Sequence, residues 1–394
     1  MSPILLASTL GRLLMIATQL AVGFLLTPDQ YGEFAVAAAL CNFLSLFQSG
    51  DLNRLALQDA RSEQRASAEL RSLLLSGCVL SAAGITALAA LGGGKVNLWF
   101  AACLGVLPFL RVMANMRITL LSSRGASEKI AVVSSVEAVA RSAVSISLAL
   151  AGFGGWSLLL GEVCAVASSL VAVNRYCPGP GDAPPALRPE VLRSVGMVSL
   201  ASLLNLVERE LPIFAVGLAA GSNAAGSYAF ASRIAVQMVI VTLPIITLEV
   251  IPRLLAAREN ANDFERTRKT EWRRVVLIGG ALAFVLGVCA PLTMYALWGE
   301  RWLGAVQTLP LLVLATAVRV AYLFNRAVLE ARGGFRTIFL ISIVDASLIV
   351  AAASLTLAHG GPVLLATGLL AEACVMVGLS RSAVRRTVGL KEPS

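Results

Sequence analysis

Long apolar runs follow one another along nearly the whole chain, separated by short polar stretches. Runs of about 19–27 residues suit helices that cross a hydrocarbon core of ~30 Å. The pattern predicts twelve transmembrane helices, near residues 4–26, 32–50, 71–91, 97–121, 130–151, 156–173, 195–219, 227–251, 275–297, 303–329, 337–358 and 362–380. Because almost no sequence is left for a soluble domain, the predicted fold class is an all-α, polytopic membrane protein.

The two halves of the chain repeat one another. The stretch from Arg111 to Ala138 matches the stretch from Arg319 to Ala346, 208 positions later, at Arg-Val, Leu, Arg-Gly, Ile and an acidic residue followed by Ala. Gly-Gly pairs at 154–155 and 360–361, which predict tight turns between antiparallel helices, follow in the same order. The matches predict two six-helix lobes. Since each lobe has an even number of spans, we expect a pseudo-twofold axis along the membrane normal and a substrate site between the lobes.

The lobe boundaries follow from proline content. Residues 177–190 are rich in Pro and Gly and predict a cytoplasmic linker between an N-terminal lobe, 1–176, and a C-terminal lobe, 191–384. Residues 385–394 are expected to form a cytoplasmic tail. The polar segment from Pro252 to Arg274 is expected to extend the neighbouring helices, to lie on anionic headgroups, or to form a solvated loop.

Composition supports membrane integration. The chain is 57% hydrophobic and 14% charged, whereas a soluble domain is about one-quarter charged. Its net charge of +9 does not indicate nucleic-acid binding, because the basic residues are spread over short loops. Of the 32 Lys and Arg residues, 22 fall in loops on one side of the predicted membrane and only Lys95 and Arg301 in loops on the other. The positive-inside rule therefore predicts that both termini are cytoplasmic.

Cysteine and histidine give no sign of a metal, a cofactor or a disulfide framework. Six of the seven Cys lie inside apolar runs, there is no CxxC pair, and His359 is the one histidine. The loops predicted to be external are too short to cover a substrate for catalysis. We therefore expect neither a cofactor nor an enzymatic activity.

Charged residues inside the predicted spans are the candidate functional groups. A charge at mid-bilayer costs about 2.5–3.5 kcal/mol, so each one needs a partner or a water-filled cavity. Glu137 and Arg141 are one helical turn apart and can pair. Arg111 with Glu137, and Arg319 with Asp345, could pair across neighbouring helices. Such pairs either stabilise the fold or couple transport to an ion; Glu162 and Glu372 are further deep acidic residues.

Arg12 differs from these residues, because its span contains no acidic residue. The apolar run from Pro3 to Leu26 that contains it is too long for a cleaved signal peptide, so we expect it to remain as the first span. An intramembrane guanidinium facing a hydrated cavity suits a phosphate group, to which it donates a planar fork of hydrogen bonds. Arg209 and Arg233 are further candidates for this role.

Several short motifs resemble a known family. They are residues 26–35, 47–54, 210–217, 225–234 and 298–302. Together they resemble the polysaccharide biosynthesis flippases of the multidrug/oligosaccharidyl-lipid/polysaccharide exporter superfamily. The resemblance implies two lobes around a central cavity in the bacterial inner membrane. It also implies that an undecaprenyl-pyrophosphate-linked oligosaccharide is flipped from the cytoplasmic to the periplasmic leaflet. Arg12, Arg54 and Arg233 match positions where the family carries basic residues.

Four hypotheses for the function follow. The first is the flippase, with the lipid-linked oligosaccharide, membrane lipids and a polysaccharide polymerase or other assembly proteins as partners. The second is a cation-coupled multidrug antiporter of the same superfamily, which would need an acidic, aromatic-lined cavity, whereas only 6% of the residues are aromatic. The third is a membrane enzyme. The fourth is a structural or channel protein, and no sequence feature indicates that function.

Overall fold

The structure is a computed structural model of the chain. It describes residues 17–44, 126–176 and 189–388, together with Leu14, Ala82 and single positions between 107 and 121. Contacts between Cα atoms divide the chain into two compact units, Met1–Glu210 and Leu211–Ser394. Most of the predicted linker, and most of the predicted spans near 4–26, 71–91 and 97–121, lie outside the described residues.

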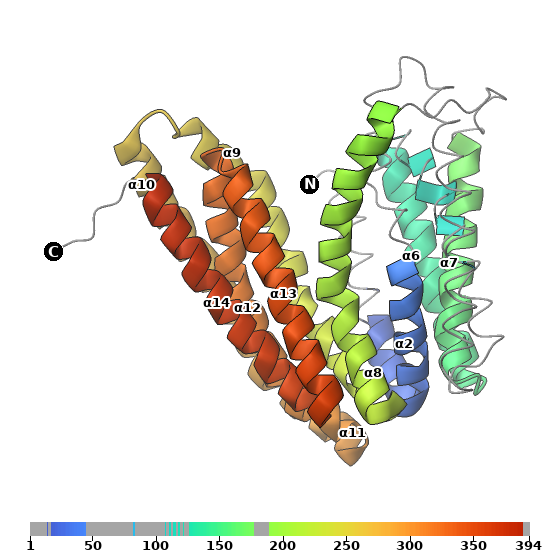
Figure 1. The fold of residues 1–394 in the computed structure, drawn as a ribbon. Helices are drawn as coiled ribbons and strands as arrows, with labels where there is room; N and C mark the ends of the chain where they lie inside the picture. The colour runs from blue at the N-terminus through green and yellow to red at the C-terminus, as the bar shows by residue number, and fades with distance from the viewer. Residues whose placement is uncertain are drawn as a thin grey trace. The chain divides into compact units, whose positions relative to one another are not determined.

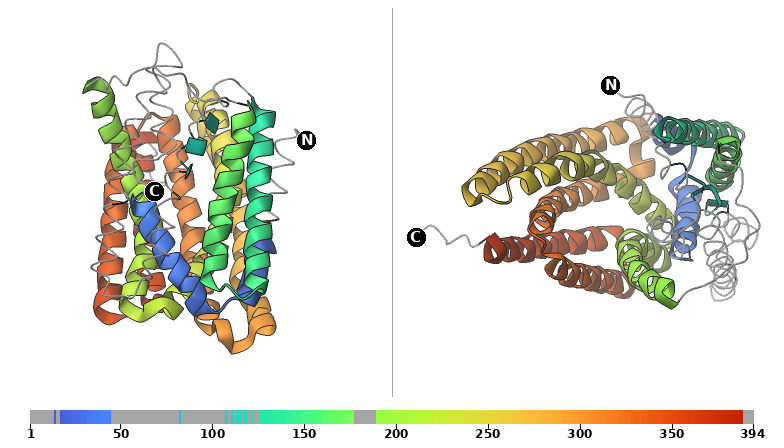
Figure 2. Two further views of the ribbon diagram at one scale, coloured as in Figure 1. Left: turned by 90° about the vertical axis from the view of Figure 1, so that its right-hand side faces the viewer. Right: turned by 90° about the horizontal axis from the view of Figure 1, so that it is seen from above.

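The first unit contains α2 (Pro28–Leu44), α6 (Ser127–Leu150), α7 (Gly155–Tyr176) and the start of α8. Figure 2 shows α6 and α7 as neighbouring antiparallel helices. The turn between them needs glycine, because Gly152 has φ 82° and Gly154 has φ 56°. Both predicted spans, near 130–151 and 156–173, are confirmed.

Small residues let α6 and α7 approach closely. A Cβ atom added at Gly161 of α7 would lie 1.9 Å from the Oγ of Ser145 on α6. The second unit repeats this contact, since a Cβ atom at Gly368 would lie 3.0 Å from the Cβ of Ala352. Close approach at small residues is a common way to pack helices in a membrane, where the hydrophobic effect does not drive helices together.

The long helix α8 (Pro189–Ile245) is two helices joined at a kink. Gly221 has φ 84° and ψ 179°, a backbone conformation outside the helical region. The two parts correspond to the spans predicted near 195–219 and 227–251. Pro189, which was predicted to belong to the linker, instead begins α8. The first residue of a helix makes no N–H hydrogen bond within the helix, so a proline at this position costs none.

The second unit is built around α12, α13 and α14, which lie side by side (Figure 1). Each of these helices begins within two residues of the start of its predicted span. The elements of this unit after α8 are η2 (Ile246–Val250), α9 (Ile251–Ala256), α10 (Ala261–Phe284), η3 (Val285–Cys289), α11 (Ala290–Trp298), η4 (Gly299–Trp302), α12 (Leu303–Ala331), α13 (Phe335–His359) and α14 (Pro362–Val388). The π-helical segments η2 and η3 lie close to prolines, which remove backbone donors and widen a turn.

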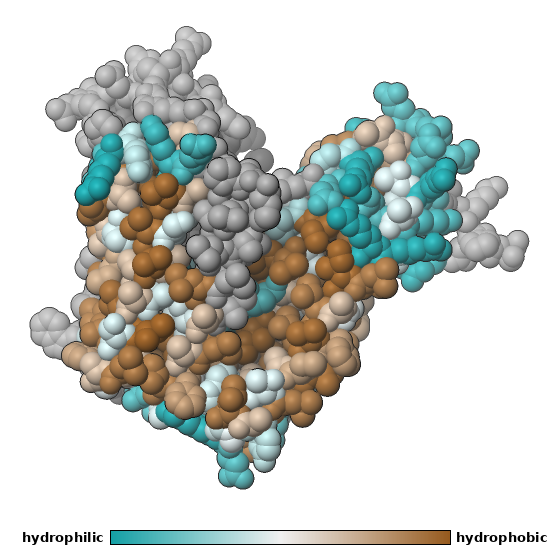
Figure 3. All heavy atoms as spheres, turned by 180° about the vertical axis from the view of Figure 1, so that it is seen from behind, coloured by the Kyte–Doolittle hydropathy of each residue, from teal (hydrophilic) through white to brown (hydrophobic). Residues whose placement is uncertain are grey.

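Hydrophilic side chains gather at the end of the second unit formed by α9 and the start of α10, whereas apolar side chains cover the helices beyond it (Figure 3). Leu254 and Phe264 are fully buried at this end and belong to the hydrophobic core of the second unit. The guanidinium of Arg332 lies 3.9 Å from the centre of the Phe264 ring. The segment from Pro252 to Arg274 therefore extends the neighbouring helices, and the solvated-loop alternative is wrong.

Every element in the described ranges is a helix, and six stretches of these ranges are long and apolar enough to cross a membrane. The all-α, polytopic fold class is thus confirmed. Both units place charged side chains near the middle of such helices, and these side chains form the candidate site.

Candidate functional site

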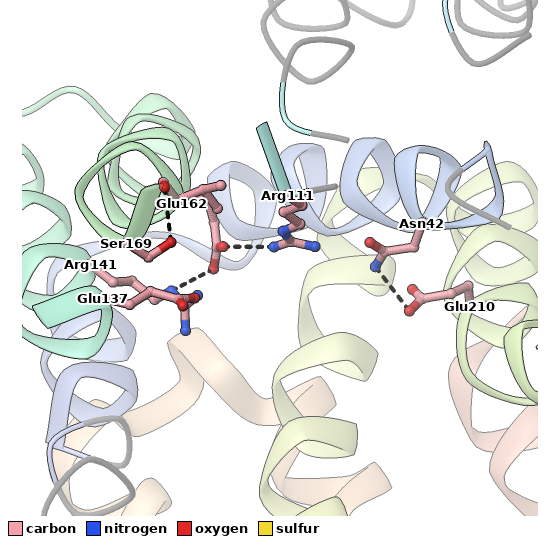
Figure 4. A network of polar contacts seen from close by, with 8 residues as sticks. Asn42, Arg111, Glu137, Arg141, Glu162, Ser169 and Glu210 are labelled. Atoms are coloured by element: carbon pink, nitrogen blue, oxygen red, sulfur yellow. Dashed lines mark hydrogen bonds and ion pairs between the residues drawn. The ribbon is translucent and has the colours of Figure 1, made fainter. Parts of the chain in front are cut away.

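The first unit holds an ion network between α6, α7 and the segment that contains Arg111 (Figure 4). The Nη2 of Arg141 donates to the Oε1 of Glu137 at 2.7 Å, and its Nε lies 3.0 Å from the Oε1 of Glu162. The Nη2 of Arg111 donates to the Oε2 of Glu162 at 2.8 Å. Arg141 thus connects a carboxylate on its own helix with one on the next helix. We call Arg111, Glu137, Arg141 and Glu162 the N-network.

A polar contact in the same unit joins α2 to α8. The Nδ2 of Asn42 donates to the Oε1 of Glu210 at 3.0 Å (Figure 4), and Glu210 is buried. A hydrogen bond from a neutral amide stabilises the carboxylate without neutralising its charge. The sequence patterns did not predict this contact.

The second unit holds the counterpart of the N-network. The Nη2 of Arg319 on α12 donates to both carboxylate oxygens of Asp345 on α13, at 3.0 and 3.1 Å. The same nitrogen lies 3.7 Å from the Oε1 of Glu372 on α14. Asp345 and Glu372 are 6% and 3% exposed, so both carboxylates are buried. We call Arg319, Asp345 and Glu372 the C-network.

Both networks lie far from the helix ends. Asp345 and Glu372 are each about ten residues from the start of their helix, which places them about 15 Å along it. At such a depth an unpaired charge is costly, and an ion pair with hydrogen bonds offsets much of that cost. Because Arg111, Arg141 and Arg319 contact carboxylates, their charges are largely neutralised within the protein.

The contacts of the deep charges can be compared with those expected from the sequence. Glu137 contacts Arg141, and Arg319 contacts Asp345, as expected. Arg111 was expected to pair with Glu137, but its contact is with Glu162 on α7. A signal for Glu162 was present in the sequence, because Glu162 and Glu372 are 210 positions apart, close to the shift of 208 that relates the other members of the networks.

The structure describes two of the four arginines that were expected to bind the substrate. Arg12 and Arg54 lie outside the described residues. Arg209 and Arg233 both lie on α8, on either side of the kink at Gly221, and both side chains are exposed. Arg209 belongs to the first unit and Arg233 to the second.

Comparison with protein families gives one match. The model of a family described as "Polysaccharide biosynthesis protein" matches residues 22–307, which is well over half of the chain. The chain belongs to this polysaccharide biosynthesis protein family. A search of curated proteins found no match.

Solved structures with a similar fold are transporters. An inward-facing multidrug resistance MATE family transporter of the MOP superfamily gives a TM-score of 0.71 at 16% identity, over 96% of this chain and 95% of that chain. A MOP superfamily transporter from Pyrococcus furiosus, whose binding pocket is described as having reverse polarity, gives a TM-score of 0.59 at 16% identity, over 98% of this chain and 94% of that chain. An outward-facing MATE family transporter of the MOP superfamily gives a TM-score of 0.59 at 15% identity, over 100% of this chain and 95% of that chain.

These identities establish a shared fold and not a shared substrate. A member of the polysaccharide biosynthesis protein family with this fold, and with several helices long and apolar enough to cross a membrane, is a multi-pass membrane protein.

Proposed function

We propose that this chain is a flippase that moves a polyprenyl-pyrophosphate-linked oligosaccharide from the cytoplasmic to the periplasmic leaflet of a bacterial inner membrane. The observation that carries the proposal is the family match over residues 22–307, in a chain whose fold is that of transporters. A surface polysaccharide is built on a lipid carrier, and its sugar headgroup is too polar to cross the apolar core unaided. A membrane protein of such a pathway whose described residues are mostly apolar helices suits this transfer step.

The pyrophosphate requires cations that the substrate can reach. The contacts of Arg111, Arg141 and Arg319 with carboxylates argue against these three as substrate ligands. Arg209 and Arg233, with exposed side chains on α8, are better suited to the role. We assign them to the anionic headgroup together with Arg12 and Arg54. Guanidinium groups suit phosphate oxygens because they donate two parallel hydrogen bonds.

The membrane potential favours this direction of transfer. An inside-negative potential lowers the free energy of an anion on the outer side by about 2.3 kcal/mol per charge per 100 mV. The basic end formed by α9 and α10 would then face the cytoplasm, together with both termini. A polysaccharide polymerase or another assembly protein would receive the flipped lipid.

The proposal is tested with the purified full chain in liposomes that contain a fluorescent polyprenyl-pyrophosphate oligosaccharide. A membrane-impermeant glycosidase added outside removes the label only from lipids in the outer leaflet. We expect the protein to raise the digested fraction from about one half, the value for an even distribution, towards completion. Labelled lipid that stays protected, combined with transport of cationic drugs, would support the multidrug antiporter instead.

The arginines are tested in the same assay. We expect Arg209→Ala and Arg233→Ala each to slow flipping by about tenfold, since a lost charge-assisted hydrogen bond is worth roughly 1.5–3 kcal/mol. Arg12→Ala should abolish transport while the protein level in the membrane stays normal. Arg266→Ala removes an exposed arginine of the α10 end and is the matched control. Equal rates for Arg209→Ala, Arg233→Ala and the control would contradict the assignment to the headgroup.

A further inference from the structure

Basic side chains outnumber acidic ones at the polar end of the second unit, where α12 and α14 end and α13 begins. The segments that form this end, residues 249–274, 326–336 and 381–386, contain thirteen Lys or Arg and six Asp or Glu. Among the described residues, three of the six carboxylates form ion pairs, and they do so with four of the basic residues. A positive excess therefore remains at this end after its ion pairs have formed.

Two turns meet at this end, the turn from α9 to α10 and the turn from α12 to α13. The Nη1 of Arg332 donates to the backbone oxygen of Arg258 at 3.4 Å, and its guanidinium covers the ring of Phe264. The Nη2 of Arg258 lies 3.9 Å from the place that a Cβ atom of Gly333 would take. Both guanidinium groups thus lie beside the α12–α13 turn, and Arg336 follows as the second residue of α13.

These three arginines are not used for ion pairs inside the protein. Within the part of the chain that the structure describes, no carboxylate forms an ion pair with Arg258, Arg332 or Arg336. The nearest acidic residues along the sequence, Glu259 and Glu330, are exposed. Guanidinium groups beside one turn suit a phosphate group, because each of them donates two parallel hydrogen bonds to its oxygens.

An exposed apolar stripe on α13 begins next to these arginines. Leu340, Ile343 and Val344 follow Arg336 by four, seven and eight positions, so they lie on the same face of the helix. They are 54%, 41% and 39% exposed, and Phe335 beside Arg336 is 64% exposed. The helix that carries them is long and apolar enough to cross a membrane. We call Leu340, Ile343 and Val344 the α13 stripe.

We propose that the α12–α13 turn binds an anionic phospholipid of the surrounding membrane. Arg258, Arg332 and Arg336 donate hydrogen bonds to the phosphate group, and an acyl chain lies along the α13 stripe. Phe335 lies at the level of the headgroup, where aromatic side chains are favoured. The positive excess at this end attracts the negative charge of the lipid. This site does not depend on the proposed flippase function.

The α13 stripe favours a lipid over other anions. A free phosphate ion, or an acidic segment of another protein, would engage the three arginines and leave the stripe uncovered. A phospholipid uses both features, because its charge lies directly above its apolar chains. The order of cations and apolar residues along α13 has the same sequence as the headgroup and chains of such a lipid.

Binding is tested with the full-length protein, freed of lipid in detergent and titrated with dioleoylphosphatidylglycerol. Native mass spectrometry counts the lipids bound to each protein. We expect one phosphatidylglycerol to bind at least tenfold more tightly than dioleoylphosphatidylcholine, which has the same chains and no net charge. Equal affinities for the two lipids would overturn the proposal, since the chains alone would then explain the binding.

The arginines are tested with matched variants. Arg258→Gln and Arg336→Gln should each weaken the binding of phosphatidylglycerol by about tenfold, because each loses a charge-assisted hydrogen bond. Arg266→Gln and Arg273→Gln are the controls: both remove an exposed arginine of α10, about half a turn around the helix from Phe264. At 0.15 M salt, where charges more than ~8 Å apart are screened, we expect less than twofold weakening. Equal losses in all four variants would overturn a specific site.

Two further measurements distinguish the occupants. Leu340→Gln should weaken phosphatidylglycerol binding, because it places a polar group against the chain, and unchanged binding would contradict the role of the α13 stripe. Millimolar inorganic phosphate should leave the bound lipid in place. Displacement by this ion would assign the arginines to a soluble anion instead. Preferential binding of a polyprenyl phosphate would assign the turn to the cargo lipid and would also overturn the proposal. Failure of flipping in the liposome assay, with this binding intact, would contradict the flippase function alone.

Discussion

The N-network and the C-network occupy equivalent places in the two halves of a duplicated chain, yet they are not equivalent electrostatically. Arg111 and Arg319 correspond, and each contacts an acidic residue of the helix hairpin that follows it in sequence. In the N-network the ion-paired side chains are 20–38% exposed, whereas in the C-network they are 2–18% exposed. The C-network is therefore the more deeply buried one. A duplicated scaffold can keep its ionic framework while the burial of that framework changes from one half to the other.

Among the described residues, the networks differ in their arginines: Arg111 and Arg141 both contact carboxylates in the N-network, and Arg319 does so in the C-network. Arg141 uses its Nη2 for Glu137 and its Nε for Glu162, so its guanidinium bridges two helices. Lysine could not make this bridge with the same geometry, since its ammonium group is a point charge. Ile349 cannot make it at all. The two networks thus differ at one pair of positions, Arg141 and Ile349, and substitutions in either network test that difference.

The largest effect is expected for Arg319→Ala. Removing the guanidinium takes a counter-charge away from two buried carboxylates, which should lower the free energy of unfolding by about 3–5 kcal/mol. Denaturant unfolding in mixed micelles measures this change. Arg111→Ala is the matched variant: its side chain is 38% exposed and Arg141 remains, so a loss of about 1 kcal/mol is expected. Equal losses for the two variants would show that the networks do not differ in the way described.

A smaller effect is expected for Arg141→Ile, which gives the N-network the residue that the C-network has. Glu137 would then lose its contact with Arg141, and Glu162 would keep its contact with Arg111. We expect a loss of about 2 kcal/mol, the value of a hydrogen bond to a charged group. Denaturant unfolding in mixed micelles measures this loss. A variant as stable as the wild type would show that the bridge from Arg141 to Glu137 and Glu162 does not stabilise the packing of α6 on α7.

The helix contacts beside the two networks predict a further difference. Gly161→Ala places a Cβ atom 1.9 Å from the Oγ of Ser145, and Gly368→Ala places one 3.0 Å from the Cβ of Ala352. Overpacking of this kind costs about 1–3 kcal/mol, and the tighter contact at Gly161 should cost more. Thermal unfolding in detergent measures both. Ser145→Gly and Ala352→Gly make room on the facing helix, so each should restore stability in combination with the alanine variant of its partner. Additive effects would contradict a direct clash.

Much of the fold could be predicted from the sequence. Apolar runs of the right length identified α12, α13 and α14, because the bilayer leaves few alternatives for such runs. The 208-residue shift identified Arg111, Arg319 and the acidic residues of the following helix as members of one pattern. Helical spacing identified the contact of Glu137 with Arg141, since residues four apart lie on the same face.

The contacts between helices were harder to predict. The pairing of Arg111 with Glu162 depends on how α7 is turned and shifted relative to its neighbours, which the spacing within one helix does not define. The contact of Asn42 with Glu210 joins residues 168 positions apart, and no periodicity connects them. The kink at Gly221 was expected only as a loop between two spans, because a glycine in the sequence does not reveal its φ angle.

The smallest effect is expected outside the membrane, at the start of α10. The Nε and Nη2 of Arg268 each donate to Glu265 at 2.7 Å, and this hydrogen bonding holds the pKa of the Glu265 carboxyl below its ordinary value of 4.5. A carboxylate with a lowered pKa in the folded state stabilises the fold above its ordinary pKa, and that stabilisation is lost as the pH falls through the lowered value. Glu265→Gln should therefore cost roughly 0.5 kcal/mol at neutral pH and less below pH 4.5, with salt weakening the effect. Hydrogen exchange of the first turns of α10 measures this local loss, and Glu259→Gln, an exposed change in the preceding turn, is the control. Water and salt screen this surface pair. A loss of stability at Glu265 as large as that of Arg319→Ala would therefore show that burial does not decide how strongly an ion pair stabilises this protein.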